Sequence, residues 1–182
     1  MKITPTQLPD VLLVQPTVHG DDRGFLMETY REDIFNLAGL RVRFVQDNHS
    51  LSRKGVLRGL HYQIKHPQGK LVRVVAGEIY DVAVDLRRSS PSFGGWAAEK
   101  LSVENRHQLY IPPGFAHGFL VLSEVAEVLY KATDYYAPRW ERTLLWNDPA
   151  LGIPWPLDGD QLPQVSGKDT VGKVLAEAET YA

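Results

Sequence analysis

The alternation of side chains near the middle of the chain is the feature that most narrows its possible folds. Across residues 79–86 every second side chain belongs to one set, which is Tyr80, Val82, Val84 and Leu86. A period of two is typical of a β-strand, because successive side chains of a strand point to opposite faces of the sheet. The segment is therefore predicted to be a strand.

Further short strands are predicted on both sides of this one. The candidates are residues 70–75, 96–101, 108–111 and 127–130, with turn residues at 48–50, 87–91, 112–114 and 137–138. Many short strands separated by turns predict an all-β sandwich or barrel. Such chains close into jelly rolls or barrels, which hide the edges of their strands.

Helix is scarce. Thr29 and Glu32 form a capping-box pattern and Gly39 can end a helix, so a short helix is predicted near residues 31–38. A second one is predicted near residues 171–179, capped by Thr170. Repeats and linkers are missing from the sequence, so we expect one domain over residues 1–182.

Composition excludes several classes of function. The chain has 182 residues, no cysteine and a net charge of −2, which removes disulfides, thiolate metal sites and a cysteine nucleophile. No block of lysine and arginine favours nucleic-acid binding, and no apolar run is long enough for a membrane span or a signal peptide. We therefore expect a cytoplasmic protein without nucleic-acid or membrane partners.

Charge is unevenly distributed along the chain. Between residues 21 and 88 there are twelve Lys and Arg against nine Asp and Glu. Charge counts alone favour a solvated surface. The alternative interpretation is a pocket for an anionic small molecule.

A histidine, a lysine and tyrosines stand on predicted strands. His61 is a ready general base, although a lone histidine on a core strand is more often structural. Lys70 could stabilise an oxyanion if it is buried, or could extend its ammonium to solvent. Tyr130 could donate a proton or simply pack. Together these groups suit proton transfer beside a carbonyl.

Gly59 interrupts the strand pattern between Arg58 and His61. These two residues have opposite parity, so a regular strand would aim them at opposite faces. A bulge at Gly59 would let both face one cavity. A glycine packed beneath a large side chain is the equally supported alternative.

Other catalytic motifs find little support. Metal sites of jelly-roll enzymes place His-x-His on one strand, but His61 is followed two residues later by Gln63. Dispersed histidines at positions 49, 61, 66 and 117 could still converge. The sequence contains no Walker loop, no dinucleotide glycine motif and no Gly-x-Ser-x-Gly elbow.

Six ordered motifs resemble the dTDP-4-dehydrorhamnose 3,5-epimerase family, over about residues 10 to 170. The most specific is Val-Leu-Arg-Gly-Leu-His-Tyr-Gln at residues 56–63. The others occupy residues 20–25, 44–50, 81–87 together with 90–94, 111–119 and 130–138. The resemblance implies a cupin-type jelly roll, also called a double-stranded β-helix, with a few short peripheral helices. It further implies a homodimer that needs no metal and no other cofactor.

The resemblance also implies a reaction and a set of site residues. Family members invert C3 and C5 of dTDP-4-dehydro-6-deoxy-D-glucose and form dTDP-4-dehydro-L-rhamnose for dTDP-L-rhamnose biosynthesis. By similarity, His61 would be the base with Asp169 as its partner, Tyr130 the acid, and Lys70 the group that steadies the enolate. The nucleotide sugar would be held by Arg23, Glu28, Gln46, Asn48, Arg58, His117, Glu141 and Lys168, with Tyr136 or Tyr135 stacked on thymine.

Three other functions are weighed against this one. A mono-epimerase that inverts only C5 or only C3 of a related dTDP-deoxysugar would use the same residues. A sugar-binding jelly roll without catalysis has no need of a base and an acid together. A metal-dependent oxygenase is disfavoured by Gln63.

Overall fold

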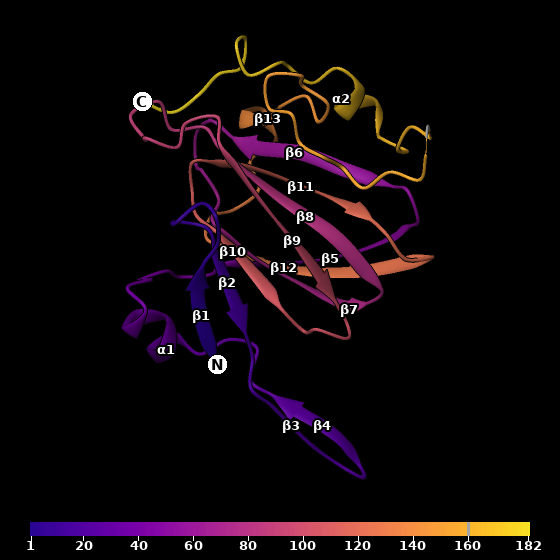
Figure 1. The fold of residues 1–182 in the computed structure, drawn as a ribbon. Helices are drawn as coiled ribbons and strands as arrows, with labels where there is room; N and C mark the ends of the chain where they lie inside the picture. The colour runs from indigo at the N-terminus through magenta and orange to yellow at the C-terminus, as the bar shows by residue number, and fades with distance from the viewer. Residues whose placement is uncertain (160) are drawn as a thin grey trace.

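Two antiparallel β-sheets face each other in the computed structural model, which describes residues 1–159 and 161–182 (Figure 1). The six-stranded sheet contains, in spatial order, β1 (Lys2–Pro5), β2 (Leu12–Gln15), β10 (Gln108–Ile111), β7 (Lys70–Ala76), β12 (Val125–Ala132) and β5 (Gln46–Arg53). The five-stranded sheet contains β13 (Glu141–Thr143), β6 (Leu57–Gln63), β11 (Phe115–Val121), β8 (Glu78–Asp85) and β9 (Trp96–Ser102). The prediction of an all-β jelly roll is confirmed.

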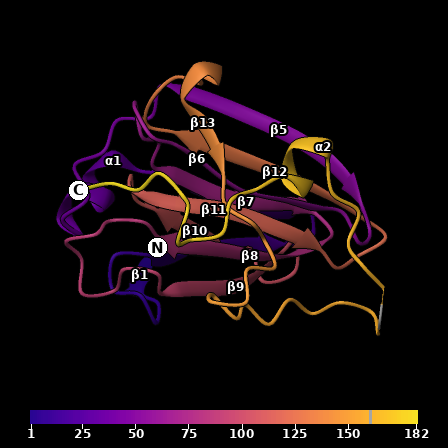
Figure 2. The ribbon, with the colours of Figure 1, turned by 90° about the horizontal axis from the view of Figure 1, so that it is seen from above.

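The alternating segment forms β8, and both of its faces are buried. Ile79 and Ala83 contribute to the core between the sheets, whereas Val82 and Val84 belong to a second apolar cluster. Residues 144–181 supply Leu144, Leu151 and Ala178 to that cluster. Figure 2 shows this C-terminal part of the chain, in orange and yellow, running across the five-stranded sheet. The sheet that carries β6 and β11 is therefore covered on both sides.

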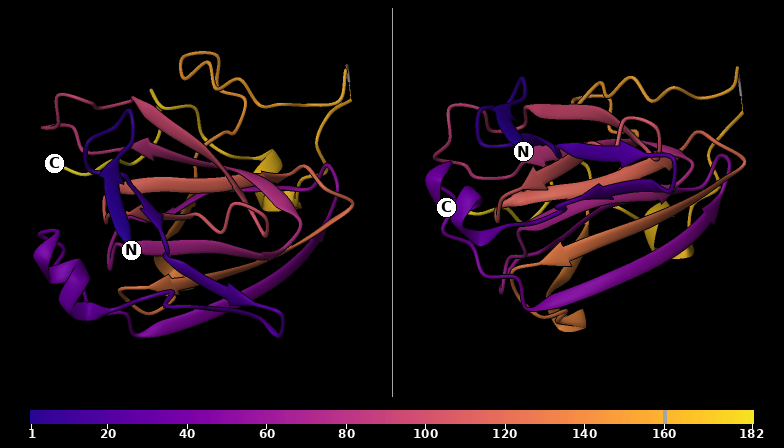
Figure 3. Two further views of the ribbon diagram at one scale, coloured as in Figure 1. Left: turned by 60° about the horizontal axis from the view of Figure 1, so that its bottom comes forward. Right: turned by 90° about the horizontal axis from the view of Figure 1, so that it is seen from below.

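The first predicted helix is confirmed as α1 (Glu32–Leu37). Gly39, with φ of +83°, follows its last turn and ends it as expected. The capping box is not formed, because Arg31 occupies the N-cap and no side chain caps the helix. The helix lies at the side of the molecule (Figure 3) and is held by packing instead. Phe35 is fully buried in an apolar cluster with residues of the six-stranded sheet.

The second predicted helix is wrong. Residues 171–179 form turns and a bridge, and the helix of this region is α2 (Gly167–Thr170), which contains Thr170 rather than following it. The backbone of Lys173 explains the difference, because its N–H donates to Thr143 at 2.9 Å and its carbonyl accepts from Leu145 at 2.8 Å. Backbone groups that already bond to the segment at residues 143–145 cannot form helical hydrogen bonds.

A hairpin of β3 (Val18–Asp21) and β4 (Gly24–Met27) projects from the body of the molecule (Figure 1). It forms a two-stranded sheet of its own and exposes Phe25 and Leu26 to 56% and 74%. The remaining short element is the 3-10 turn η1 (Pro138–Trp140). Among the described residues, no helix is long and apolar enough to span a membrane.

Candidate active site

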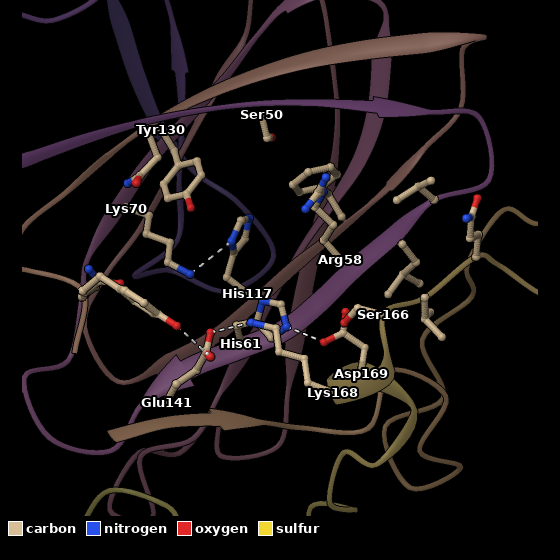
Figure 4. A pocket seen from close by; sticks show the side chains of 18 of the residues that line it. Ser50, Arg58, His61, Lys70, His117, Tyr130, Glu141, Ser166, Lys168 and Asp169 are labelled. Carbon is tan, nitrogen blue, oxygen red and sulfur yellow. Dashed lines mark hydrogen bonds and ion pairs between the residues drawn. The ribbon is translucent and has the colours of Figure 1, made fainter. Parts of the chain in front are cut away.

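A cavity of about 610 Å³ opens between the two sheets, and most of the predicted site residues line it (Figure 4). This volume suits a small organic ligand. The predicted residues that line it are Gln46, Asn48, Arg58, His61, Lys70, His117, Tyr130, Tyr136, Glu141, Lys168 and Asp169. They come from β5, β6, β7, β11, β12, β13, α2 and the segment after β12.

A bulge at Gly59 brings Arg58 and His61 to the same cavity. Arg58 pairs with Phe119 and His61 with His117, so two residues of β6 oppose one residue of β11. Gly59 has φ of +127°, and a Cβ there would lie 2.6 Å from the Cα of Gly118. The bulge is confirmed, and the glycine is required by a close approach of two backbones rather than by a large side chain above it.

His61 is paired with a buried carboxylate. Its Nε2 lies 2.5 Å from Oδ1 of Asp169, which is 2% exposed. Burial alone would raise the pKa of Asp169, but the hydrogen bond and charge of His61 hold the pKa below its usual value. Asp169 therefore stays ionised and orients the ring, while Nδ1 of His61 makes no hydrogen bond to a described residue. That nitrogen can accept a proton.

Lys70 lies at one end of a buried chain of hydrogen bonds. Its Nζ is 3.4 Å from Nδ1 of His117, whose Nε2 is 2.8 Å from Oδ1 of Asp81. Oδ1 of the fully buried Asp81 accepts from Nε2 of His117, which leaves Nδ1 to accept from Nζ of Lys70. Burial lowers the pKa of Lys70 to about 8 and also lowers the pKa of His117.

Sequence reasoning missed Asp81. It stands in the alternating strand β8, where a polar residue is expected on a solvated face. The structure instead buries this face beside β11 and His117. A buried carboxylate is energetically tolerable only with a partner, and here His117 and the more distant Lys70 provide it.

Tyr130 enters the cavity from the sheet opposite His61. It lies on β12 of the six-stranded sheet, whereas His61 lies on β6 of the five-stranded sheet. Burial raises the pKa of Tyr130, so its hydroxyl keeps its proton at neutral pH. That hydroxyl has no hydrogen bond to a described residue and lines the cavity. A proton acceptor and a proton donor thus face the same space from two sides.

Charged side chains of three elements meet at another part of the cavity wall. The ammonium of Lys168 donates to Glu141 at 2.8 Å, and the hydroxyl of Tyr136 donates to the same carboxylate at 3.1 Å. Burial would raise the pKa of Glu141, but the Lys168 ammonium outweighs it and the pKa falls below its usual value. Arg58 is exposed and donates through Nε to Ser52 at 2.9 Å. Its remaining guanidinium nitrogens can contact an anion.

Three predicted residues lie outside the cavity of this chain. Arg23 is 90% exposed on the β3–β4 hairpin, where it pairs with Asp21. Glu28 follows the hairpin and pairs with Arg31. Tyr135 is 65% exposed and does not line the cavity, whereas Tyr136 does.

The cavity also contains residues that sequence reasoning did not single out. Ser50, Phe119 and Ser166 line it. Ser50 continues the alternation that begins with Gln46 and Asn48 on β5, and this parity could have identified it. The Ser50 hydroxyl and the Asn48 amide nitrogen are buried without a partner among the described residues. Within residues 1–159 and 161–182, no group of three or more His, Asp or Glu residues is arranged to hold a metal ion.

A base with its carboxylate partner, a cation and a phenol around one cavity can carry out proton transfer next to a carbonyl. The family model described as dTDP-4-dehydrorhamnose 3,5-epimerase matches residues 5–177 of this chain. The chain belongs to the dTDP-4-dehydrorhamnose 3,5-epimerase family. The resemblance inferred from the six motifs is thereby confirmed.

Individual relatives agree with this assignment. A dTDP-4-dehydrorhamnose 3,5-epimerase of Pseudomonas aeruginosa is 58% identical over 182 residues, which are 100% of this chain and 99% of the relative. One of Salmonella typhimurium is 55% identical over 98% of this chain and 97% of its own. Among solved structures, the Legionella pneumophila epimerase RmlC, in complex with dTDP-4-keto-L-rhamnose, has a TM-score of 0.93 and 50% identity. The match covers 98% of this chain and 94% of that one.

Proposed function

We propose that the protein inverts C3 and C5 of dTDP-4-dehydro-6-deoxy-D-glucose and so forms dTDP-4-dehydro-L-rhamnose. One observation carries the proposal: His61 with Asp169 and Tyr130 face one cavity from opposite sheets, with Lys70 on the neighbouring strand of Tyr130. Inversion needs a proton removed from one face of the sugar and returned on the other. A binding protein would have no use for this arrangement.

The C4 ketone makes the chemistry feasible. C3 and C5 both adjoin it, so removal of either proton places the electron pair on the C4 oxygen as an enolate. His61 takes the proton, the Lys70 ammonium stabilises the enolate oxygen, and Tyr130 returns a proton to the same carbon from the other face. His61 then releases its extra proton to solvent and Tyr130 takes one up, so both residues return to their starting states. The substrate is neither oxidised nor reduced, and the second carbon follows by the same steps.

The nucleotide is held by the charged and aromatic part of the cavity. Arg58 and Lys168 supply cations for the diphosphate, and guanidinium groups match phosphate oxygens in pairs. Tyr136, which lines the cavity, stacks on the thymine base. Gln46, Asn48 and Glu141 complete the polar contacts. Both ring nitrogens of His117 are used by Asp81 and Lys70, so His117 acts on the site through Lys70.

Arg23 and Glu28 complete the site of a second copy of the chain in a homodimer. The isolated β3–β4 hairpin carries Arg23 away from its own cavity and exposes Phe25 and Leu26. A two-stranded hairpin is marginal by itself, and an exposed apolar surface of this kind favours docking on another subunit. The hairpin of one subunit would then bring its arginine to the diphosphate of the other.

Complementation between two defective subunits tests this arrangement. Arg23→Ala and His61→Ala homodimers are both expected to have low activity, the former through a weaker hold on the diphosphate. Randomly mixed chains should recover about a quarter of wild-type activity, since half of the dimers are mixed and each has one complete site. If Arg23 served its own chain, mixing would restore no activity. Refolding of each variant with itself is the control.

Tyr130→Phe is expected to separate proton removal from inversion. Without the phenol, His61 can still take the proton and return it to the same face, so exchange with solvent continues. Net inversion should fall by roughly 10²-fold while deuterium exchange falls much less. Tyr80→Phe, on β8 against Trp155, is a control outside the cavity. Equal loss of exchange and inversion in Tyr130→Phe would argue against its role as the acid.

Proton NMR in deuterated water tests the whole proposal. The protein is incubated with dTDP-4-dehydro-6-deoxy-D-glucose, and a rhamnose-forming reductase captures the product. Deuterium at both C3 and C5, with dTDP-L-rhamnose formed, is the expected result. Deuterium at a single carbon would make the protein a mono-epimerase of a related dTDP-deoxysugar. Absence of exchange at both carbons would overturn the proposal.

A further inference from the structure

Residues 134–137, which include Tyr136 of the proposed nucleotide site, have no regular secondary structure. A backbone without ladder or helix partners must satisfy its polar groups in another way. Here side chains of three glutamines do so. Gln68 donates to the carbonyl of Asp134 at 2.8 Å, and Gln46 accepts from the N–H of Tyr136 at 2.9 Å.

Gln63 makes the remaining contacts of this group. Its amide nitrogen donates to the carbonyl of Tyr135 at 3.2 Å, and its amide oxygen accepts from the N–H of Ala137 at 2.7 Å. The nitrogen also donates to the carbonyl of His66 at 2.7 Å. Both donor hydrogens and the acceptor oxygen are therefore used within the protein. The side chain is 3% exposed, so it is not available to a ligand.

The position of Gln63 on β6 gives this contact its significance. Gln63 stands two positions after His61, with Tyr62 between them, so the side chains of Gln63 and His61 belong to the same face of the strand. The position where a metal-binding jelly roll would carry its second histidine is thus occupied by an amide. This amide forms hydrogen bonds to the backbone on either side of Tyr136. An imidazole, with one donor and one acceptor, could not make all three hydrogen bonds.

We propose that Gln63 is a positioning residue for nucleotide binding, which fixes the backbone of residues 135–137 so that Tyr136 faces the cavity. This inference rests on the proposed function, because it assumes that Tyr136 contacts the nucleotide. The Tyr136 hydroxyl donates to Glu141 at 3.1 Å, and the backbone is held on both sides of the residue. Binding of the nucleotide therefore does not have to order this segment and costs less conformational entropy. The proton-transfer groups have other partners: His61 contacts Asp169, and Lys70 contacts His117.

Gln63→Glu is the most direct test, because it preserves size and the acceptor for Ala137 but removes both donors. Its second carboxylate oxygen would face the carbonyls of Tyr135 and His66, which repel it. The dissociation constant for dTDP, measured by calorimetry, should rise about tenfold, and KM should rise with it. Deuterium exchange at saturating substrate should stay within about twofold of wild type, because the proton-transfer groups are unchanged.

Tyr181→Phe is the matched control. The Tyr181 hydroxyl donates to the backbone carbonyl of Gln63 at 2.6 Å, so its loss disturbs the same residue without touching residues 134–137. This variant should bind dTDP like wild type. If Gln63→Glu does not fold, Gln63→Met, which is similar in length and uncharged, replaces it with the same expected result.

The outcomes distinguish this inference from the proposed function. Failure of the wild-type protein to bind dTDP would overturn both. Normal dTDP binding by wild type and by a folded Gln63 variant would overturn the inference alone. Loss of exchange at saturating substrate with an unchanged dTDP affinity would also overturn it, because the residue would then act on the proton-transfer groups.

Discussion

His61→Ala is expected to stop exchange of the C3 and C5 protons with solvent. In the proposed mechanism the imidazole, oriented through Nε2 by the buried Asp169, is the base that removes both protons. General bases contribute roughly 10²- to 10⁴-fold, so the turnover number should fall by that amount. Binding of dTDP should change little, since the proposed mechanism places the ring against the sugar rather than the nucleotide. Deuterium incorporation followed by NMR measures the first effect, and calorimetry with dTDP measures the second.

Two further variants sharpen this result. His49→Ala removes another histidine, exposed on β5 and paired with Glu127, and should leave the turnover number unchanged. Asp169→Asn retains the shape of the partner but removes its charge, so exchange should fall by less than in His61→Ala. Normal exchange in His61→Ala would assign the base to another residue.

Lys70→Met should lower the turnover number by roughly 10²- to 10³-fold, the range found when a donor to a developing oxyanion is removed. The ammonium is anchored at His117 and retains two other N–H groups for the C4 oxygen. Methionine keeps the unbranched chain but cannot donate. Lys131→Met is the control, because this lysine lies one strand away and pairs with Asp47 at 3.0 Å.

The pH dependence of the wild-type protein should carry the signature of Lys70. Burial lowers its pKa to about 8, against the smaller opposing effects of Asp81 and Glu141. The cation that stabilises the enolate is present below this pKa and is lost as the pH rises through it. Activity should therefore decline on the alkaline side near pH 8, far below the pKa of an ordinary lysine. The residual activity of Lys70→Met should not decline near pH 8. If the decline persisted in this variant, the titrating group would be a residue other than Lys70.

Local patterns in the sequence predicted much of the fold. The alternation at residues 79–86 indicated β8 because strand geometry depends only on neighbouring residues. Gly39 ended α1 for the same reason. The helix predicted at residues 171–179 failed because pairing of Lys173 with Thr143 and Leu145, distant in sequence, overrode local preference. The hydrogen bonds of Gln63 were likewise invisible, since they join three segments of the chain.

The sequence by itself determined the fold class, the family and most of the side chains around the cavity, because alternation and ordered motifs are properties of short segments. Only the tertiary structure decided how these side chains meet. Asp169 reaches His61 across 108 residues because the C-terminal segment crosses the five-stranded sheet and places α2 beside β6. Asp81 is a buried partner of His117 because both faces of β8 are covered. Such contacts require two side chains to lie within a few ångströms of each other. The number of residues between them in the sequence does not predict whether they do.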